Sequence, residues 1–557
     1  MPARHRALAS AWALTLAHLL SACGGSDDDA PAPAAAPTVT TQYGTLEGAL
    51  HGSGSMKQFL GIPYAAPPVG ELRWKAPAPP APWSGTRSAT SYGHHCPQKA
   101  TSPLSSYGTA GGQEDCLYLN VFTPTTSGPH PVMVWIHGGA FLYGRGLGYT
   151  PVRLTAQGVV VVTINYRLGS LGFLAHPALN DAQGHSGNYG VMDQTAALQW
   201  VKNNIHNFGG DPGNVTIAGQ SAGAASVLTQ LNSAKTANLF NKAILESGPV
   251  TDQPTGAAAQ ASGATVGASN FGCPNDANAA TCLRALSADF IVANQPSATF
   301  SSTNSPNVDG DYLVRTNLAA VYGNLLANKV PVIIGNTVDE YTSLLAGEET
   351  ALNNASLAAG SPASALVLPG AAGYQSLLAT DPALTARLTA TFGPTLAPVV
   401  AAQYPAANYG GSRPLALSAA VTDYLFACGT RRAAKAMQAS GIPVYAYEFN
   451  DPNAPMALQP QVSFPFKAYH ASEIQYLFDL PSAASLSAQQ RTLADQMTAY
   501  WANFVKSRNG DPNASGSAAW PPYSASEPVL QFAPTGSSVI NNFSATHKCT
   551  SLWTPGI

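Results

Sequence analysis

The sequence predicts an α/β fold in which a mostly parallel central sheet is covered by helices on both faces. Short runs of apolar, β-branched residues recur, and they are continuous rather than alternating, as in strands that are buried on both faces. Stretches of helical character separate several of these runs, which is the order that produces parallel strands. The expected strands are residues 132–136, 159–164, 215–218, 243–245, 330–334 and 444–447.

Helices are expected at residues 195–205, 222–231 and 488–508, and Asn509-Gly510 ends the last of them, as these residue types often do. Residues 353–437 are rich in Ala and Leu with several prolines, and should form helices over the working edge of the sheet. The chain has 557 residues, 45% of them hydrophobic, which is enough for one large core. We therefore expect a single domain with insertions.

Charge excludes some kinds of partner. The net charge is −3, charged residues make up 10% of the chain, and no basic stripe is present. We expect no nucleic-acid partner, because a phosphate backbone needs such a stripe. Cys-x-x-Cys and His-Glu-x-x-His patterns do not occur, so no metal is expected.

The N-terminus has the pattern of an export signal. Arg4 and Arg6 precede an apolar run that is too short to span a membrane well, and small residues follow it. Leu-Ser-Ala-Cys at residues 20–23 resembles the bacterial lipobox, which implies cleavage before Cys23 and acylation of its thiol. The alternative is an ordinary signal whose cysteine is accidental. We expect a signal at residues 1–22, a flexible tether at 23–37 and the α/β domain at 38–557, in an exported lipoprotein that contacts the membrane only through its anchor.

Seven cysteines are present, so six remain if Cys23 carries lipid. In an exported chain an even remainder suggests three disulfides, although six cysteines allow fifteen pairings. The six are Cys96, Cys116, Cys273, Cys282, Cys428 and Cys549.

A candidate nucleophile lies in Gly219-Gln220-Ser221-Ala222-Gly223. The spacing Gly-x-Ser-x-Gly is a weak signal alone, but here it follows a β-branched strand and opens an Ala-rich helix. That context is the one a nucleophile elbow of the α/β-hydrolase fold requires. Ser221 is the predicted nucleophile, and a purely structural strand–helix turn is the alternative.

A serine hydroxyl needs a base, and in α/β-hydrolases the acid and then the histidine follow the serine. Only His470 and His547 follow Ser221. His547 lies two residues before Cys549, where a disulfide should fix it at the periphery. His470 lies in an aromatic loop beyond the strand at 444–447, and is the favoured base.

The acid should lie on a loop that leaves the carboxyl end of a strand. Asp339 and Glu340 fit best, because they follow the strongest strand. Glu246 also ends a strand, but that strand immediately follows the nucleophile's helix. Spacing alone leaves Asp339 and Glu340 unresolved.

Donors for an oxyanion are expected in the loop after the strand at 132–136. His137-Gly138-Gly139 follows that strand and resembles the His-Gly-Gly loops of esterases. Such a loop presents backbone N–H groups.

Several motifs together resemble the type B carboxylesterase family, over about residues 42–549. Besides the elbow and the Gly-Gly-Ala-Phe loop, these are Phe-Leu-Gly-Ile-Pro-Tyr at 59–64, Glu-Asp-Cys-Leu-Tyr-Leu-Asn-Val at 114–121 and Asn-Tyr-Arg at 165–167. The resemblance implies an α/β-hydrolase fold and hydrolysis of carboxylic esters through an acyl-enzyme. It implies no cofactor, and a small-molecule ester as the partner.

The resemblance also assigns residues. It implies a triad of Ser221, His470 and Glu340, with Asp339 as a neighbour. The implied oxyanion donors are the N–H groups of Gly139, Ala140 and Ala222. The implied disulfides are Cys96–Cys116, Cys273–Cys282 and Cys428–Cys549, and the implied buried ion pairs are Arg73–Glu114 and Arg167–Asp193.

Two departures from the family pattern bear on specificity. Gln220 stands where the family usually has Glu, and Tyr341 where it usually has Gly. Cholinesterases hold a cationic substrate against a tryptophan in the loop of the first disulfide, but here Tyr107 is the only aromatic between Cys96 and Glu114. We therefore expect neutral, short-acyl or aryl esters to be preferred.

A lipase and a non-catalytic esterase-like binding module are the two alternative functions. A lipase needs an amphipathic lid, whereas the segment between Cys96 and Cys116 is short and rich in Ser and Gly, although residues 353–437 could still shield a gorge. A non-catalytic esterase-like binding module should lack a triad member, and all three are present.

Overall fold

The computed structural model describes most of the chain from residue 36 to residue 554. Within that range the residues outside the description are 53, 100–109, 297–302, 348–377, 379–380, 457–461, 463, 482 and 514–518. The expected signal peptide, Cys23, nearly all of the tether and Tyr107 thus lie outside the described residues, as does much of 353–380.

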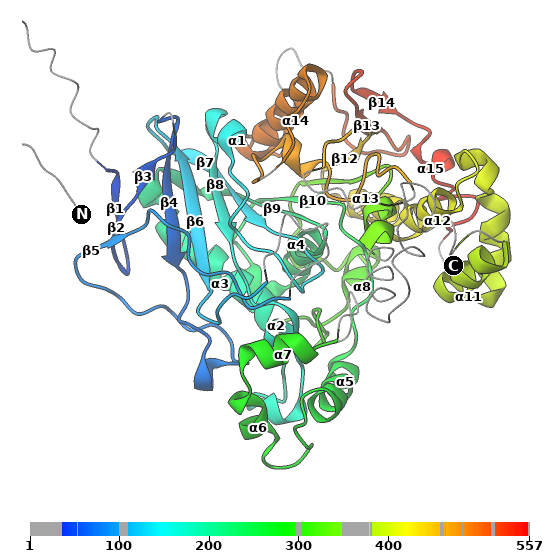
Figure 1. Ribbon diagram of the computed structural model, residues 1–557. Coiled ribbons are helices and arrows are strands. Elements are labelled where there is room, and N and C mark those ends of the chain that lie inside the picture. The colour runs from blue at the N-terminus through cyan, green and yellow to red at the C-terminus, as the bar shows by residue number, and fades with distance from the viewer. Residues whose placement is uncertain are drawn as a thin grey trace, which may run out of the picture. The chain divides into compact units, whose positions relative to one another are not determined.

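The fold is built on one large mixed sheet and one small sheet (Figure 1). The strands are β1 (Thr38–Thr41), β2 (Gly44–Glu47), β3 (Ala49–Leu50), β4 (Met56–Pro63), β5 (Thr86–Ser88), β6 (Tyr118–Pro124), β7 (His130–Ile136), β8 (Val160–Ile164), β9 (Gly210–Gln220), β10 (Lys242–Glu246), β11 (Val332–Thr337), β12 (Val444–Phe449), β13 (Val529–Phe532) and β14 (Ser538–Ile540). The large sheet has eleven strands in the order β14-β13-β12-β11-β10-β9-β7-β8-β6-β4-β3, and β1-β2-β5 form the small one. The seven central strands pair in parallel: β13, β12, β11, β10, β9, β7 and β8. The outer strands β14, β6, β4 and β3 pair antiparallel.

Helices cover both faces of the large sheet. They are α1 (Val152–Ala156), α2 (Gly169–Phe173), α3 (Tyr189–Asn204), α4 (Ala222–Asn232), α5 (Gly256–Ser269), α6 (Ala279–Ala285), α7 (Ala288–Asn294), α8 (Asn317–Tyr322), α11 (Asp381–Gln403), α12 (Arg413–Thr422), α13 (Cys428–Ala439), α14 (Ala488–Lys506) and α15 (Phe543–Thr546). Side chains alternate along each strand, so Val132 and Val134 of β7 pack in one core with α3 and α4. Met133 and Trp135 pack in the second core with α14.

A local signal explains where the last of the three predicted helices begins, whereas α3 begins at Tyr189, six residues before its predicted start. Ser487 caps α14: its hydroxyl accepts a hydrogen bond from the Gln490 N–H, and the Gln490 side chain accepts one from the Ser487 N–H. This reciprocal pair satisfies two donors that the first turn of a helix leaves free. The helix ends at Lys506, two residues before the predicted end.

The predicted fold class is confirmed, and the six apolar runs correspond to β7 through β12. The outer antiparallel strands were not predicted. β3 has two residues and β14 has three, and polar residues interrupt the apolar ones in β4 (MKQFLGIP) and β6 (YLNVFTP), so none of them carries a continuous apolar run. Short edge strands lack the burial that makes central strands recognisable.

Three disulfides and two ion pairs, one of them fully buried and one partly buried, cross-link the fold. The bonds are Cys96–Cys116, Cys273–Cys282 and Cys428–Cys549, which are the pairs that the resemblance implies. Arg73 pairs with Glu114 and Arg167 with Asp193, also as implied. Within the described residues, no helix combines the length and apolar character needed to cross a membrane.

Candidate active site

Ser221 stands in the turn between β9 and α4 with an unusual backbone conformation. Its φ is 59° and its ψ is −124°, a region in which residues other than glycine are strained. The Ser221 N–H donates to the Glu246 carbonyl across 2.8 Å, and the Ser221 carbonyl accepts from the Ala225 N–H across 2.9 Å. Strand β10 and the first turn of α4 therefore hold the strained residue in place.

The two glycines of the motif allow β9, β7 and α4 to approach one another closely. A Cβ on Gly219 would lie 2.6 Å from the carbonyl of Gly223, and one on Gly223 would collide with the carbonyl oxygen of Ile136. Only glycine fits at both positions. This is the packing that the Gly-x-Ser-x-Gly spacing predicts.

The glycine loop after β7 lies directly against Ser221. A Cβ on Gly138 would stand 3.0 Å from the Cβ of Ser221, while Gly139 has a φ of 107° and Ala140 a φ of 55°. Within the described part of the chain, the backbone N–H groups of Gly139, Ala140 and Ala222 donate to no acceptor. Three unused donors next to a serine are suited to an oxyanion.

His470 contacts Glu340, and not Asp339. Its Nδ1 lies 2.5 Å from Oε2 of Glu340, whose other oxygen accepts from the Thr337 N–H across 2.7 Å. Glu340 is fully buried. Asp339 instead accepts from the Ala468 N–H and lies 3.7 Å from Lys467, and burial raises its pKa to about 6. Of the two carboxylates that spacing left open, only Glu340 is therefore hydrogen-bonded to His470.

The second ring nitrogen of His470, Nε2, forms a hydrogen bond with the side-chain amide of Gln220. The distance between Nε2 of His470 and Nε2 of Gln220 is 3.2 Å. The Oγ of Ser221 makes no hydrogen bond with any described residue, and it shares a pocket with His470. A neutral amide therefore occupies the place next to the imidazole where the family usually has a carboxylate.

Ser221 and His470 line one pocket with about 890 Å³ of empty space, part of it open to solvent. The pocket walls are mostly aromatic and aliphatic, and none of the described lining residues is Asp, Glu, Lys or Arg. The other lining residues are Gly138, Gly139, Ala140, Tyr143, Tyr149, Gln220, Ser343, Leu344, Phe426, Met456, Tyr469, Ala471 and Ile474.

Two further carboxylates lie behind this site. Glu246 accepts from the Trp501 indole N–H across 2.7 Å, and Glu473 accepts from the Ser247 hydroxyl across 3.1 Å. Burial raises the pKa of Glu246 to about 8, and burial together with Glu340 and Glu246 raises that of Glu473 well above its usual value. Glu246, considered above as an acid, is thus directed to a tryptophan rather than to His470.

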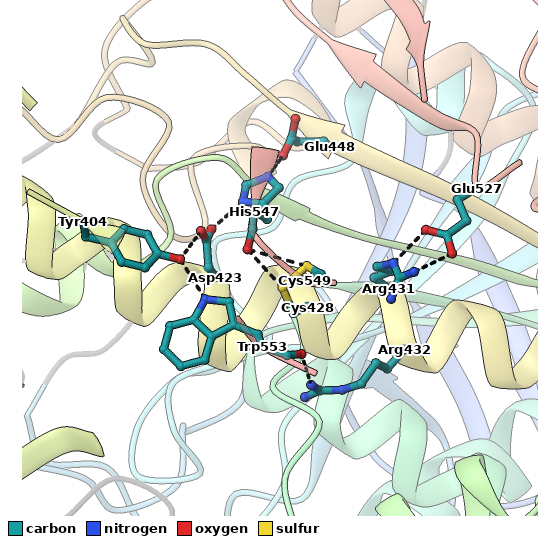
Figure 2. The surroundings of a disulfide bond; sticks show 10 residues. All are labelled: Tyr404, Asp423, Cys428, Arg431, Arg432, Glu448, Glu527, His547, Cys549 and Trp553. Carbon is teal, nitrogen blue, oxygen red and sulfur yellow. Dashed lines mark hydrogen bonds and ion pairs between the residues drawn. A yellow bond between two sulfur atoms is a disulfide. The ribbon is translucent and has the colours of Figure 1, made fainter. Parts of the chain in front are cut away.

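His547 is not peripheral, in contrast to the expectation from sequence. It is 4% exposed and lies between Asp423 and Glu448, beside the disulfide Cys428–Cys549 (Figure 2). The disulfide holds the tail inside the protein rather than at its rim. Among the described residues, no group of three or more His, Cys, Asp or Glu side chains has an arrangement that could hold a metal ion.

Comparisons with known proteins agree on one family. Residues 35–551 match the sequence profile described as the Carboxylesterase family. The fumonisin B1 esterase of Sphingopyxis macrogoltabida is 34% identical over 512 residues, which are 88% of this chain and 85% of that one. The para-nitrobenzyl esterase of Bacillus subtilis is 34% identical over 503 residues, 87% and 92% of the two chains. The acetylcholinesterase of Bungarus fasciatus is 33% identical over 532 residues, 88% and 81%.

A solved structure described as PNB esterase superposes with a TM-score of 0.72 at 30% identity, covering 92% of this chain and 99% of that chain. Fold and relatives together place the protein among the serine hydrolases with an α/β-hydrolase fold. The chain belongs to the carboxylesterase family. It is accordingly an enzyme that hydrolyses carboxylic esters.

Proposed function

We propose that the protein hydrolyses neutral, short-acyl or aryl esters through a triad of Ser221, His470 and Glu340. His470 takes the proton of Ser221 as the hydroxyl attacks the ester carbonyl, and Glu340 orients the ring and stabilises the imidazolium. The N–H groups of Gly139, Ala140 and Ala222 bind the oxyanion. The alcohol leaves, and water then hydrolyses the acyl-enzyme. No step of this mechanism calls on a cofactor.

The observation that carries this proposal is the 2.5 Å contact between Nδ1 of His470 and Oε2 of Glu340, with the ring exposed to the pocket that Ser221 lines. A carboxylate on Nδ1 selects the tautomer in which Nε2 is free to accept a proton. The strained serine and the three unused N–H donors complete what acyl transfer requires.

The pocket lining supports neutral esters. Because no described lining residue carries a formal charge outside the proposed triad, the walls offer no counter-ion to an ammonium or carboxylate group of a substrate. The names of the relatives indicate different substrates: one is an acetylcholinesterase, and the others are a fumonisin B1 esterase and a para-nitrobenzyl esterase. A series of neutral esters from acetate to palmitate tests the chain length: a maximum at long acyl chains would favour a lipase.

Ser221→Ala tests the nucleophile. Loss of a triad member should lower kcat by about a million-fold, with far-UV circular dichroism unchanged. An organophosphonate should add one adduct to the wild type, on Ser221, and none to the variant. An adduct on another residue, or full activity in the alanine variant, would refute the assignment.

We also propose that the protein is exported and anchored through a lipid on Cys23, with residues 38–557 as the enzyme domain. The three disulfides support export, because such bonds persist in oxidising compartments. Mass spectrometry should find a diacylglyceryl group on Cys23, and Cys23→Ser should release soluble enzyme of unchanged specific activity. Detection of Cys23 in a disulfide would contradict the anchor.

A further inference from the structure

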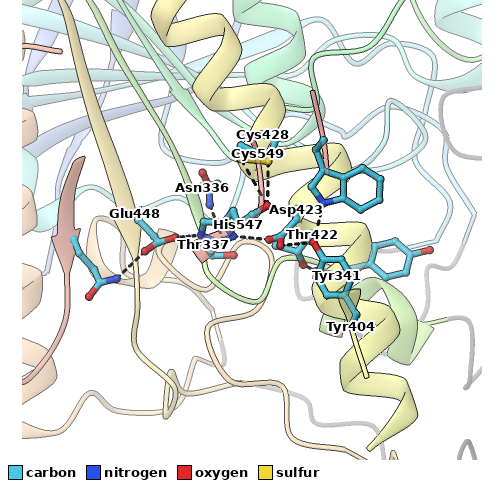
Figure 3. A network of polar contacts seen from close by, with 12 residues as sticks. Asn336, Thr337, Tyr341, Tyr404, Thr422, Asp423, Cys428, Glu448, His547 and Cys549 are labelled. Atoms are coloured by element: carbon cyan, nitrogen blue, oxygen red, sulfur yellow. Dashed lines mark hydrogen bonds and ion pairs between the residues drawn. A yellow bond between two sulfur atoms is a disulfide. The ribbon is translucent and has the colours of Figure 1, made fainter. Parts of the chain in front are cut away.

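The tail residue His547 is held by two buried carboxylates. Its Nδ1 lies 2.5 Å from Oδ1 of Asp423 and its Nε2 lies 2.6 Å from Oε1 of Glu448 (Figure 3). A ring that donates from both nitrogens is an imidazolium. Burial alone would lower the pKa of His547, but the two carboxylates raise it to about 10. His547 is therefore a buried cation between two anions.

The remaining oxygens of both carboxylates are also satisfied. The Tyr404 hydroxyl donates to Oδ2 of Asp423 across 2.7 Å, and the Gln531 amide donates to Oε2 of Glu448 across 2.7 Å. Two residues after His547, the disulfide Cys428–Cys549 ties the tail to the start of α13 (Figure 2). Two residues of the tail thus fix it: Cys549 through a covalent bond and His547 through two charged hydrogen bonds.

Asp423 begins a π-helical turn that reaches the active site. The turn, η7 (Asp423–Ala427), joins α12 to α13, and such turns often occur at functional sites. Phe426 of this turn lines the pocket, and its ring centroid is 5.2 Å from that of His470. One residue before the turn, the Thr422 hydroxyl accepts from the Tyr341 N–H across 3.0 Å. The turn therefore contacts the ring of the proposed base, and the residue just before the turn contacts Tyr341, which follows the proposed acid Glu340.

We propose that His547 is a positioning residue for ester hydrolysis: by binding Asp423 it fixes the turn η7, which holds Phe426 against His470 in the substrate pocket. The inference rests on the proposed function of His470. Four titratable groups face or surround His547, and each comes from a different segment: Asp423 from η7, Glu448 from β12, Tyr404 from just after the end of α11 and, further off, Asp339. The charged His547 thus influences catalysis through Asp423 and the turn η7, and not by contact with the substrate pocket.

The test compares His547→Gln with Arg431→Leu. Glutamine retains a polar side chain of similar reach but no charge. Arg431, on α13, forms a bidentate ion pair with Glu527 (Figure 2), and neither residue lines the pocket. Both variants should lose thermal stability. The kcat/KM of each variant is divided by the fraction of active sites that a phosphonate labels. Only His547→Gln should lower this value, by about 10- to 100-fold, because a displacement of about 1 Å in the catalytic groups costs that much.

A double-mutant cycle with Phe426→Ala separates positioning from stability. If the effect of His547 passes through Phe426, His547→Gln should cost less than about threefold in the Phe426→Ala background, since coupled residues are not additive. Fully multiplicative effects would overturn the inference, as would an equal kinetic loss in Arg431→Leu or unchanged kinetics in His547→Gln. Should His547→Gln not be recovered folded, Asp423→Asn replaces it with the same expected outcomes. A wild type that hydrolyses no ester would instead refute the proposed function itself.

Discussion

The side-chain amide of Gln220 is within hydrogen-bond distance of Nε2 of His470, at 3.2 Å. Nδ1 of the same ring donates to Glu340, so Nε2 carries the lone pair that the proposed mechanism needs. The Gln220 amide N–H donates to that lone pair, so in the proposed mechanism the Ser221 hydroxyl must displace it before His470 can act as the base. The residue beside the nucleophile therefore affects both the charge of the site and the availability of the base.

Gln220→Glu should narrow the gap between neutral and cationic substrates. Wild type should hydrolyse a neutral butyrate ester with much higher kcat/KM than butyrylcholine, and the added carboxylate should reduce that ratio by about three- to tenfold, since each 1.4 kcal/mol of attraction is worth tenfold. It should also move the half-maximal activity to higher pH, because a nearby anion stabilises the imidazolium.

Gln220→Met serves as the control, since it removes the hydrogen bond without adding charge and should leave the substrate ratio unchanged. Steady-state kinetics on the matched esters decide the question. Equal or better efficiency of the wild type on butyrylcholine would mean that an aromatic side chain of the pocket, such as Tyr469, forms a cation site.

Gly223→Ala should abolish activity by breaking the turn that holds Ser221. The new methyl group would collide with the carbonyl of Ile136 in β7, and overpacking of this kind costs about 1–3 kcal/mol or more. Gly429→Ala is the matched control, because its Cβ would meet nothing closer than 3.9 Å and alanine favours a helix by about 1 kcal/mol. Activity and melting temperature of both variants give the answer; a fully active Gly223→Ala enzyme would be incompatible with the elbow as described.

Arg167→Met should destabilise the fold far more than Arg153→Met. Arg167 and Asp193 form a buried pair 2.7 Å apart, with side chains 4% and 0% exposed, and removing one partner of such a pair costs about 3–5 kcal/mol. Arg153 pairs with Asp479, whose side chain is 52% exposed, and such pairs contribute about 1 kcal/mol or less. Urea unfolding measures both; similar losses in the two variants would contradict this ranking.

The contribution of His547 to stability should depend on pH. Its pKa is raised to about 10 by Asp423 and Glu448 despite its burial, whereas unfolded histidine titrates at about 6.5. A raised pKa stabilises the fold fully below about pH 6.5, and this contribution declines as the pH rises and is lost through about pH 10. The difference in unfolding free energy between wild type and His547→Gln should therefore shrink from pH 6.5 to pH 10. A difference that stays constant over this range would show that His547 is not charged in the folded protein.

Local features of this protein could be predicted from sequence because they depend on short segments. The buried parallel strands appear as continuous apolar runs, and the elbow around Ser221 appears as two glycines between a strand and a helix. The chain order of acid and histidine reduced the base to His470 or His547, and the resemblance to a known family supplied the disulfide pairs.

Contacts between distant residues were decided by tertiary structure alone. Spacing could not show whether Asp339 or Glu340 contacts the histidine. The two side chains leave the backbone in different directions, and only the packed conformation of the loop determines those directions. Glu340 meets a histidine 130 residues away, while Asp339 turns toward Lys467. His547 looked peripheral because sequence shows only its neighbour Cys549, and not the two carboxylates that strand β12 and the turn η7 bring to it. Such buried charges are stable only when their partners are placed within hydrogen-bond distance, and that placement is a property of the whole fold.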